Sequence, residues 1–280
     1  MFKKVAFIGA GSMAEAIISG MIQTSFLQRE QIYVTNKNNQ ERLDRLSERY
    51  KIQCSQDKAD VLTDADVIVL SMKPYDVKVA IHAVKDYIQP HQLVVSVVAG
   101  VSTDAVSALI GHEVPVVRAM PNTSASIGYS ATAITKGQSA TRDHLNKVES
   151  LFKTIGTTAI VAEEDMHTVT GISGSGPAYF YYMVEAMEKA AVEFGLEPDI
   201  AKDLITQTVI GAGEMLKHSG ESAATLRENI TSPNGTTQAG LETLAQHDFQ
   251  NMMMACVKSA TERSIELGGE NKNETGTKEF

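Results

Sequence analysis

A glycine motif directly follows the first apolar segment and constrains the fold of this chain more than any other feature. Residues 5–8 read Val-Ala-Phe-Ile, and a G-x-G-x-x-A pattern follows with Gly9, Gly11 and Ala14 at its fixed positions. Gly9 permits a tight turn, Gly11 lets the backbone approach a pyrophosphate, and Ala14 allows close packing of a helix on the strand. The helix that begins here offers free N–H groups to phosphates. This context predicts a dinucleotide-binding unit rather than a plain glycine turn.

Residues 1–162 alternate short apolar runs with segments of helical pattern. Several of the runs are apolar throughout, which is typical of strands that are covered on both faces. Such alternation predicts an α/β domain with a parallel, doubly wound sheet. The predicted strands are 4–8, 31–36, 66–72, 93–98, 114–118, 130–135 and 157–161, and the predicted helices are 14–23, 40–50, 76–88 and 103–110.

From residue 163 onward the strand pattern stops, and an all-α domain is predicted over residues 163–267. Residues 268–280 are polar and rich in Gly and Asn, so a disordered tail is expected there. The fold class is therefore α/β followed by all-α. The predicted helices of the second domain are 176–194, 199–217, 222–229, 236–246 and 249–267.

One helix of the second domain, at residues 178–187, is apolar on nearly every face. A helix of this kind must be buried on all sides. Two interpretations stay open: a central core helix, or a helix shared across a dimer interface, where large apolar surfaces are matched.

Composition excludes several classes of function. Lys and Arg total 25 against 34 Asp and Glu, a net charge of -9, which argues against a nucleic-acid partner. No apolar run reaches the roughly 18 residues of a membrane helix, and no signal peptide is recognisable. Cys54 and Cys256 form no CxxC pair, so neither a metal site nor a disulfide framework is expected. Unpaired thiols fit a reducing compartment, and a cytoplasmic protein is predicted.

The second predicted strand ends at Asn36 and Lys37, where an acidic residue would favour NAD. Because Asn36 is neutral, Lys37 is cationic and Arg42 is nearby, the sequence predicts NADP as cofactor, with NADPH preferred and NADH usable. The carboxyl ends of parallel strands meet at one edge of a sheet, and ligands bind there. The segments that reach this edge are Ser71, Met72, Lys73 and Pro74, then Ala99 and Gly100, and then Met120, Pro121, Asn122 and Thr123.

Two loops of the helical domain are rich in Gly, Ser and Thr, at residues 171–177 and 231–237. Each presents hydroxyls and free N–H groups at the start of a helix, which suits a small carboxylate. Ordinary helix capping would account for Ser175, Thr236 or Thr237 singly, but two such loops in one helical domain are harder to explain by capping.

Five motifs identify a family resemblance: FIGAGSMA (7–14), MKP (72–74), RAMPNT (118–123), GSGPAY (174–179) and NITSPNGTTQAGL (229–241). The chain resembles pyrroline-5-carboxylate reductase over its whole length except the tail. The resemblance implies reduction of 1-pyrroline-5-carboxylate to L-proline, the last step of proline biosynthesis. It also implies an N-terminal Rossmann-like domain and a C-terminal helical domain that forms a homodimer, or a higher assembly of dimers. Many members of the family have Gly where this chain has Asn234, a residue type that tolerates the left-handed conformation.

The resemblance also implies roles for individual residues. The cyclic imine substrate is expected at Ser175, Gly176, Ser232, Thr236 and Thr237, with Glu163 a weaker candidate. The implied cofactor residues are Gly9, Ala10, Gly11, Ser12, Met13, Ala14, Asn36, Ser71, Met72, Lys73, Pro74, Val98, Ala99 and Asn229, to which the residue reasoning above adds Lys37 and Asn122.

A mechanism follows as a hypothesis. Hydride transfer to the C=N carbon belongs to the cofactor, and the protein supplies position and electrostatics. Loop N–H groups with the Ser175 and Ser232 hydroxyls would hold the substrate carboxylate. Thr237 would hydrogen-bond the ring nitrogen as the catalytic residue, and the iminium could enter already protonated.

Two other functions compete with this one. The β-hydroxyacid dehydrogenases share the two-domain plan and the motif GxxGxGxxxK, but Phe180 stands where their catalytic lysine would be. A non-catalytic NADP-binding regulator would be expected to carry a damaged substrate loop, and the 231–237 loop is intact apart from Asn234.

Overall fold

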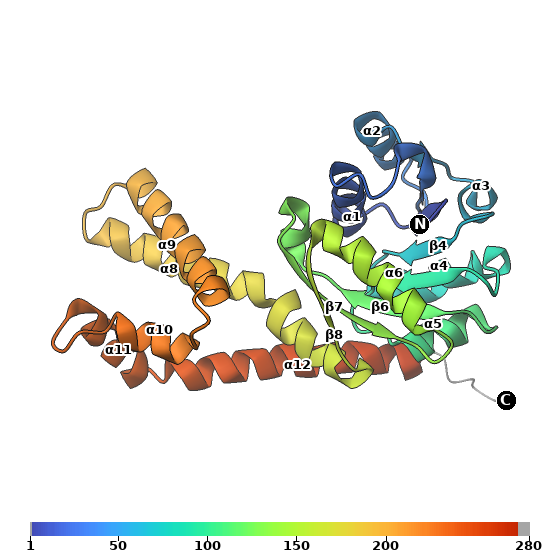
Figure 1. Cartoon of the computed structure of the whole chain (residues 1–280). Helices are drawn as coiled ribbons and strands as arrows, with labels where there is room; N and C mark the ends of the chain where they lie inside the picture. The colour runs from blue at the N-terminus through green and yellow to red at the C-terminus, as the bar shows by residue number, and fades with distance from the viewer. Residues whose placement is uncertain (1, 274–280) are drawn as a thin grey trace. The chain divides into compact units, whose positions relative to one another are not determined.

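The computed structural model describes residues 2–273 of the 280-residue chain (Figure 1). By internal contacts these residues form two compact units. The first, the sheet unit, contains residues 2–175 together with residues 258–273, and the second, the helical unit, contains Gly176–Val257. The predicted boundary at residue 163 therefore differs from this division, because residues 163–175 and the end of the last helix pack with the sheet.

One eight-stranded sheet forms the centre of the sheet unit, with strand order β3-β2-β1-β4-β5-β6-β7-β8. The glycine motif follows its central strand β1, and every predicted strand is present with slightly different ends. The two-residue strand β3 at the sheet edge was not predicted. The strands are β1 Val5–Ile8, β2 Ile32–Thr35, β3 Gln53–Cys54, β4 Val67–Leu70, β5 Leu93–Ser96, β6 Val116–Met120, β7 Ser130–Lys136 and β8 Gly156–Ile160.

The predicted parallel, doubly wound sheet is confirmed with one exception, because β7 runs antiparallel to β6. The chain returns through a short 3-10 turn, Thr123–Ile127, which ends at Gly128 with φ +79°. A direct connection of this length joins antiparallel strands, whereas a parallel pair needs a long crossover. The other strand pairs are parallel.

Both faces of the sheet are covered by helices, and each face has its own apolar core. Along β1, Val5 and Phe7 belong to one core, while Ala6 and Ile8 belong to the other. The helices of the sheet unit are α1 Ser12–Gln23, α2 Gln40–Tyr50, α3 Lys58–Leu62, α4 Val77–His82, α5 Thr103–Ile110, α6 Arg142–Phe152 and α7 Met166–Val169, with a π-helix at Thr170–Gly174 and 3-10 turns at Arg29–Gln31, Pro74–Asp76, Lys85–Tyr87, Lys153–Ile155 and Glu163–Asp165.

Four of these helices differ from the sequence prediction. The single helix expected over residues 76–88 is divided into α4 and two 3-10 turns, and α3, α6 and α7 were not predicted. Two of the missed helices carry clear start signals, since Asp57 caps α3 and Thr141 with His144 forms a capping box on α6.

The second unit contains helices only, in agreement with the prediction of an all-α segment (Figure 1). The last helix begins in this unit and continues past Leu267 to Asn273, and its residues from Lys258 onward belong to the sheet unit. The predicted start of the tail at 268 is therefore corrected, while residues 274–280 lie outside the described part. Gly268 packs tightly there: a Cβ on it would lie 2.6 Å from the Gly100 carbonyl oxygen. The helices are α8 Gly176–Glu193, α9 Pro198–His218, α10 Ala223–Asn229, α11 Thr236–Gln246 and α12 Phe249–Asn273.

Helix α8 is the apolar helix singled out in the sequence, and in this single chain it is largely open. Phe180, Tyr181 and Tyr182 are 58%, 65% and 77% exposed. The interpretation of α8 as a core helix of its own chain was therefore wrong. Within residues 2–273, no helix combines the length and apolarity needed to cross a bilayer.

Candidate functional site

The turn after β1 can be built only with glycine at its first position. Gly9 has φ +112°, and a Cβ on it would lie 2.7 Å from the carbonyl carbon and oxygen of Ser71. Ser71 holds the turn from the other side, because its hydroxyl donates to the Gly9 carbonyl at 3.0 Å. The loops after β1 and β4 are thus in backbone contact.

Gly11 is the N-cap residue of α1, and no side chain caps this helix. A Cβ on Gly11 would have 4.0 Å to its nearest neighbour, the Ser71 carbonyl oxygen, so space remains beside it. The first-turn N–H groups of a helix have no intrahelical acceptor. The N-terminus of α1, at Ser12, Met13 and Ala14, therefore presents N–H groups that could bind an anionic group, and their role toward the cofactor stays a prediction.

Arg42 occupies a different place from the one that the cofactor prediction assumed. Its Nε donates to the Ala10 carbonyl at 2.7 Å, and its Nη2 lies 2.5 Å from Glu15 Oε2. Burial raises the pKa of Glu15, but the hydrogen bonds from Arg42 and Tyr50 outweigh it and leave that pKa below its usual value. Arg42 therefore braces the glycine loop, and it shares the Glu15 carboxylate with Arg49.

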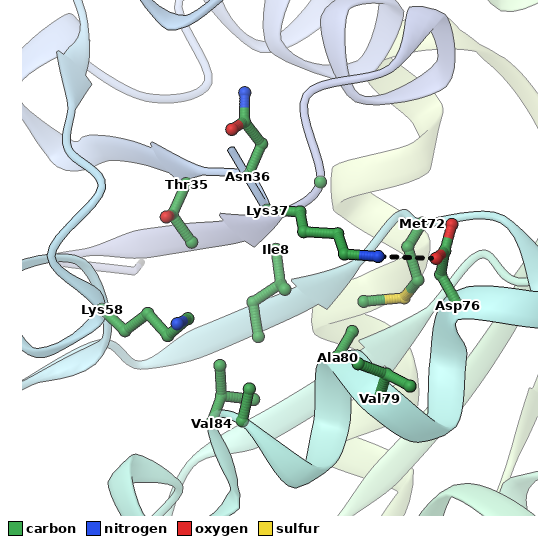
Figure 2. A pocket seen from close by; sticks show the side chains of 12 residues that line it. Ile8, Thr35, Asn36, Lys37, Lys58, Met72, Asp76, Val79, Ala80 and Val84 are labelled. Atoms are coloured by element: carbon green, nitrogen blue, oxygen red, sulfur yellow. Dashed lines mark ion pairs between the residues drawn. The ribbon is translucent and has the colours of Figure 1, made fainter. Parts of the chain in front are cut away.

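A pocket of about 140 Å³ opens beside this loop, at the carboxyl ends of β1, β2 and β4 (Figure 2). Its volume is below the roughly 300–1,000 Å³ of sites that enclose a whole ligand, so it can take one part of a dinucleotide. Figure 2 shows the wall from α4 as apolar side chains. The lining residues are Ile8, Gly9, Thr35, Asn36, Lys37, Lys58, Met72, Asp76, Val79, Ala80, Ala83 and Val84.

Three charged residues line the pocket (Figure 2). Lys37, after β2, reaches Asp76 across the pocket with Nζ 3.7 Å from its carboxylate, and it is 74% exposed. Lys58, the first residue of α3, has no ion pair within residues 2–273. Two cations against one carboxylate leave the pocket with an excess positive charge.

The remaining predicted cofactor residues lie in both units. Asn36 lines the pocket, but its side chain also closes a turn with Asn39 and accepts from Gln56. In the sheet unit, Lys73 and Pro74 begin the 3-10 turn before α4, and Val98 and Ala99 follow β5. Asn229 ends α10 in the helical unit.

Glu163 lies in the sheet unit, where its carboxylate is already occupied. It pairs with Arg118 of β6 at 2.5 Å and accepts from the Thr103 hydroxyl at 3.0 Å. Arg118 is 1% exposed. In this structure Glu163 therefore joins β6, α5 and the turn after β8, and its role toward substrate stays a prediction.

Ser175 follows a π-helix, and its N–H donates to the Thr170 carbonyl five residues back at 2.9 Å. Short π segments inside helical stretches are frequent at functional sites. Gly176 is the next residue and begins α8.

The start of α11 gathers the other predicted substrate residues. Gly235 is its N-cap without a side-chain cap, and Ser232 folds against it, since a Cβ on Gly235 would lie 2.6 Å from Ser232 Oγ. Asn234 has φ +58°, which confirms that Asn tolerates the left-handed position here. Thr236 and Thr237 form the first turn. The start of α11 therefore has N–H groups without a side-chain cap and hydroxyl groups beside them.

Sequence reasoning missed three residues near these sites. Lys58 could have been found as a cation directly after the Asp57 cap of α3, had that helix been predicted. Asp76 was hidden because its segment was assigned to one long helix. Arg118 could have been found because it lies inside an apolar strand, and a buried Arg requires a partner.

Two segments of the chain match known families. Residues 163–267 match the family described as "Pyrroline-5-carboxylate reductase dimerisation". Residues 4–100 match "NADP oxidoreductase coenzyme F420-dependent". The first match covers the helical unit and the segment that leads into it, and the second covers the glycine motif and the pocket.

Curated relatives extend over nearly the whole chain. Pyrroline-5-carboxylate reductase 2 of Bacillus subtilis is 43% identical over 265 residues, which is 95% of each chain. A pyrroline-5-carboxylate reductase of Staphylococcus aureus is 39% identical over 264 residues, 94% of this chain and 97% of the relative.

Solved structures agree with these relatives. A pyrroline-5-carboxylate reductase from Coxiella burnetii superposes with a TM-score of 0.87 and 32% identity, over 95% of this chain and 98% of that one. The Plasmodium falciparum pyrroline carboxylate reductase, solved with NADP bound, gives a TM-score of 0.86 at 27% identity with the same coverage.

Proposed function

Since this chain belongs to the pyrroline-5-carboxylate reductase family and reduces 1-pyrroline-5-carboxylate to L-proline, we propose that it takes the hydride from NADPH in preference to NADH. The observation that carries this preference is the charge of the pocket after β2. Lys37 and Lys58 face it, and no acidic residue ends β2. An acidic residue there would bind the ribose 2′-OH of NAD and repel a 2′-phosphate.

The parts of the cofactor are assigned by chemistry. The uncapped start of α1, beside Gly11, suits the pyrophosphate. The apolar wall from α4 suits the adenine ring, and the two lysines suit the 2′-phosphate. When bound, the reduced nicotinamide supplies the hydride.

The substrate is assigned to the two helix starts. The N–H groups at the beginning of α11, with the hydroxyls of Ser232 and Thr236, form a polar site for the substrate carboxylate. Ser175 and Gly176, after the π-helix, are assigned to the same substrate. The Thr237 hydroxyl makes no hydrogen bond to any described residue, so it is available to the ring nitrogen. Holding the imine close to the reduced cofactor contributes much of the rate enhancement.

The reaction itself is tested by the loss of NADPH absorbance with purified protein and 1-pyrroline-5-carboxylate. We expect substrate-dependent oxidation that is faster at low concentrations of NADPH than of NADH. A β-hydroxyacid supplied with NADP⁺ is the control and should give no reduction. Tight NADPH binding without imine turnover would contradict the proposal and favour a regulator.

Replacing both lysines tests the cofactor preference. Lys37→Ala with Lys58→Ala should raise KM for NADPH by roughly tenfold or more and leave KM for NADH nearly unchanged, because a charge-assisted hydrogen bond contributes about 1.5–3 kcal/mol. Asp76→Asn is the opposite control. It frees Lys37 and should lower KM for NADPH. Equal changes for both cofactors would show that the lysines do not read the 2′-phosphate.

We also propose that the chain forms a homodimer through its helical unit. The match to a dimerisation family and the exposed aromatic side chains of α8 support this. Tyr182→Glu should shift the mass measured by light scattering from dimer toward monomer, because a charge in a matched apolar surface is costly. Asp86→Lys, at an exposed position of the sheet unit, should leave the mass unchanged.

Cys54 and Cys256, both free, support a place in the reducing cytoplasm.

A further inference from the structure

Strand β6 and the residues just beyond it contact one segment through alternate positions. Arg118 pairs with Glu163, and Met120 places its Cε methyl 2.8 Å from where a Cβ on Gly174 would lie. Asn122 donates from Nδ2 to the Ser173 carbonyl at 3.1 Å. Residues two apart on a strand point to one side. Arg118 and Met120 therefore lie on one side of β6, and Asn122, two residues beyond the end of the strand, contacts the same segment; these three residues, called here the β6 row, contact residues 163–174.

Asn122 is fixed in orientation by its two partners. Its Oδ1 accepts from the Ser124 N–H at 3.1 Å, so the NH₂ end must be the end that faces Ser173. The side chain is almost fully buried, at 9% exposed. Asn122 thus caps the turn after β6 and at the same time binds the π-helix.

The Ser173 carbonyl lacks the donor that an α-helix would give it. In an α-helix it would accept from the N–H of residue 177, but that residue is Pro177, which has no N–H. Asn122 supplies a hydrogen bond to it. Two residues further along the chain, the Ser175 N–H donates to the Thr170 carbonyl, five residues back, as in a π-helix. Asn122 therefore binds the π-helix at Ser173, two residues before Ser175.

Arg118 anchors the other end of the same segment. A buried ion pair adds little net stability, because desolvation offsets the attraction, so its main effect here is to fix which groups meet. Glu163 is the first residue of the segment, and it is held between Arg118 and Thr103.

We propose that the β6 row positions residues 163–175, with Asn122 as a positioning residue for substrate through Ser173 and Ser175 rather than as a cofactor contact. This inference rests on the proposed function, since it takes Ser175 as a substrate-binding residue. It replaces the sequence-based assignment of Asn122 to the cofactor.

Asn122→Asp keeps the cap on Ser124 and replaces the NH₂ donor with a carboxylate oxygen, which removes the hydrogen bond to Ser173 and adds a negative charge that repels the Ser173 carbonyl oxygen. We expect KM for 1-pyrroline-5-carboxylate to rise about tenfold, the effect of one lost hydrogen bond to a buried group, while the Kd for NADPH stays within about twofold. Gly174→Ala changes the neighbouring contact with Met120, and because the Met120 Cε methyl is the end of a flexible side chain that can move aside, it should raise the same KM less. Ser124→Ala, whose hydroxyl has no hydrogen bond among the described residues, is the matched control.

Amide hydrogen exchange gives a readout that does not need turnover. Exchange in residues 170–175 should be faster in Asn122→Asp than in the wild type, with the exchange of β6 unchanged. A wild type without imine turnover would contradict the proposed function but leave this comparison valid. An increase in the Kd for NADPH with unchanged substrate KM, or unchanged exchange at 170–175, would overturn the positioning role.

Discussion

Replacing Gly9 with alanine is expected to lower kcat/KM for NADPH by about a hundredfold, the cost of displacing a binding group by about 1 Å. The new Cβ would lie 2.7 Å from the Ser71 carbonyl atoms, and those are backbone atoms that cannot rotate away. The conformation at φ +112° adds strain for any residue with a Cβ. The loops after β1 and β4 must therefore separate, and the start of α1 moves with them.

The same change should lower the free energy of unfolding by about 2–4 kcal/mol, as expected from backbone strain together with overpacking. Gly11→Ala is the matched control. Gly11 has φ -75° and its Cβ would have 4.0 Å of clearance, so stability should change little. Its Cβ would nevertheless enter the space where a pyrophosphate approaches the helix, so NADPH affinity should fall.

Urea denaturation and NADPH titration of both variants separate the two effects. Gly9→Ala should lose stability and affinity together, whereas Gly11→Ala should lose affinity alone. If Gly9→Ala kept the stability of the wild type, the backbone contact with Ser71 would be looser than the structure indicates. If Gly11→Ala bound NADPH normally, the pyrophosphate would not lie at this helix start.

The features that could be predicted from sequence are those fixed by local chemistry. The glycine turn at Gly9, the left-handed Asn234 and the uncapped start of α11 each depend on a few neighbouring residues. The alternation of apolar runs predicted the strands of the sheet for the same reason. Helix α6 could also have been predicted, because its capping box is local.

Features that depend on distant contacts could not be predicted. Arg42 looked available to a phosphate, but it donates from Nε to Ala10 and from Nη2 to Glu15. The hydrogen bond from Asn122 to the Ser173 carbonyl joins residues that are far apart in the sequence, so no local pattern indicates it. Helix α12 continues past Leu267 and places Gly268 against Gly100, a contact that no local pattern reveals.

Removing the Thr237 hydroxyl is expected to lower kcat/KM for 1-pyrroline-5-carboxylate by about 10- to 100-fold, since a hydrogen bond to a charged group contributes about 1.5–3 kcal/mol. Thr237→Val makes this change at nearly constant shape, and Thr237→Ser restores the hydroxyl and should recover most of the activity. Thr243 lies on the same helix, but its hydroxyl donates to the Ala239 carbonyl. Thr243→Val should therefore leave kcat/KM close to that of the wild type.

The pH dependence of the Thr237→Val enzyme decides which partner carries the proton. If the ring nitrogen binds as a protonated iminium and donates to the Thr237 oxygen, the hydroxyl stabilises the charged form and raises the pKa of the bound imine. Its removal would then lower that pKa and shift the loss of activity at alkaline pH to a lower pH. If the hydroxyl instead donates to a neutral nitrogen, it stabilises the uncharged form, and its removal would shift that limb to higher pH. Wild-type kcat/KM in Thr237→Val at every pH would show that the ring nitrogen is held by another group.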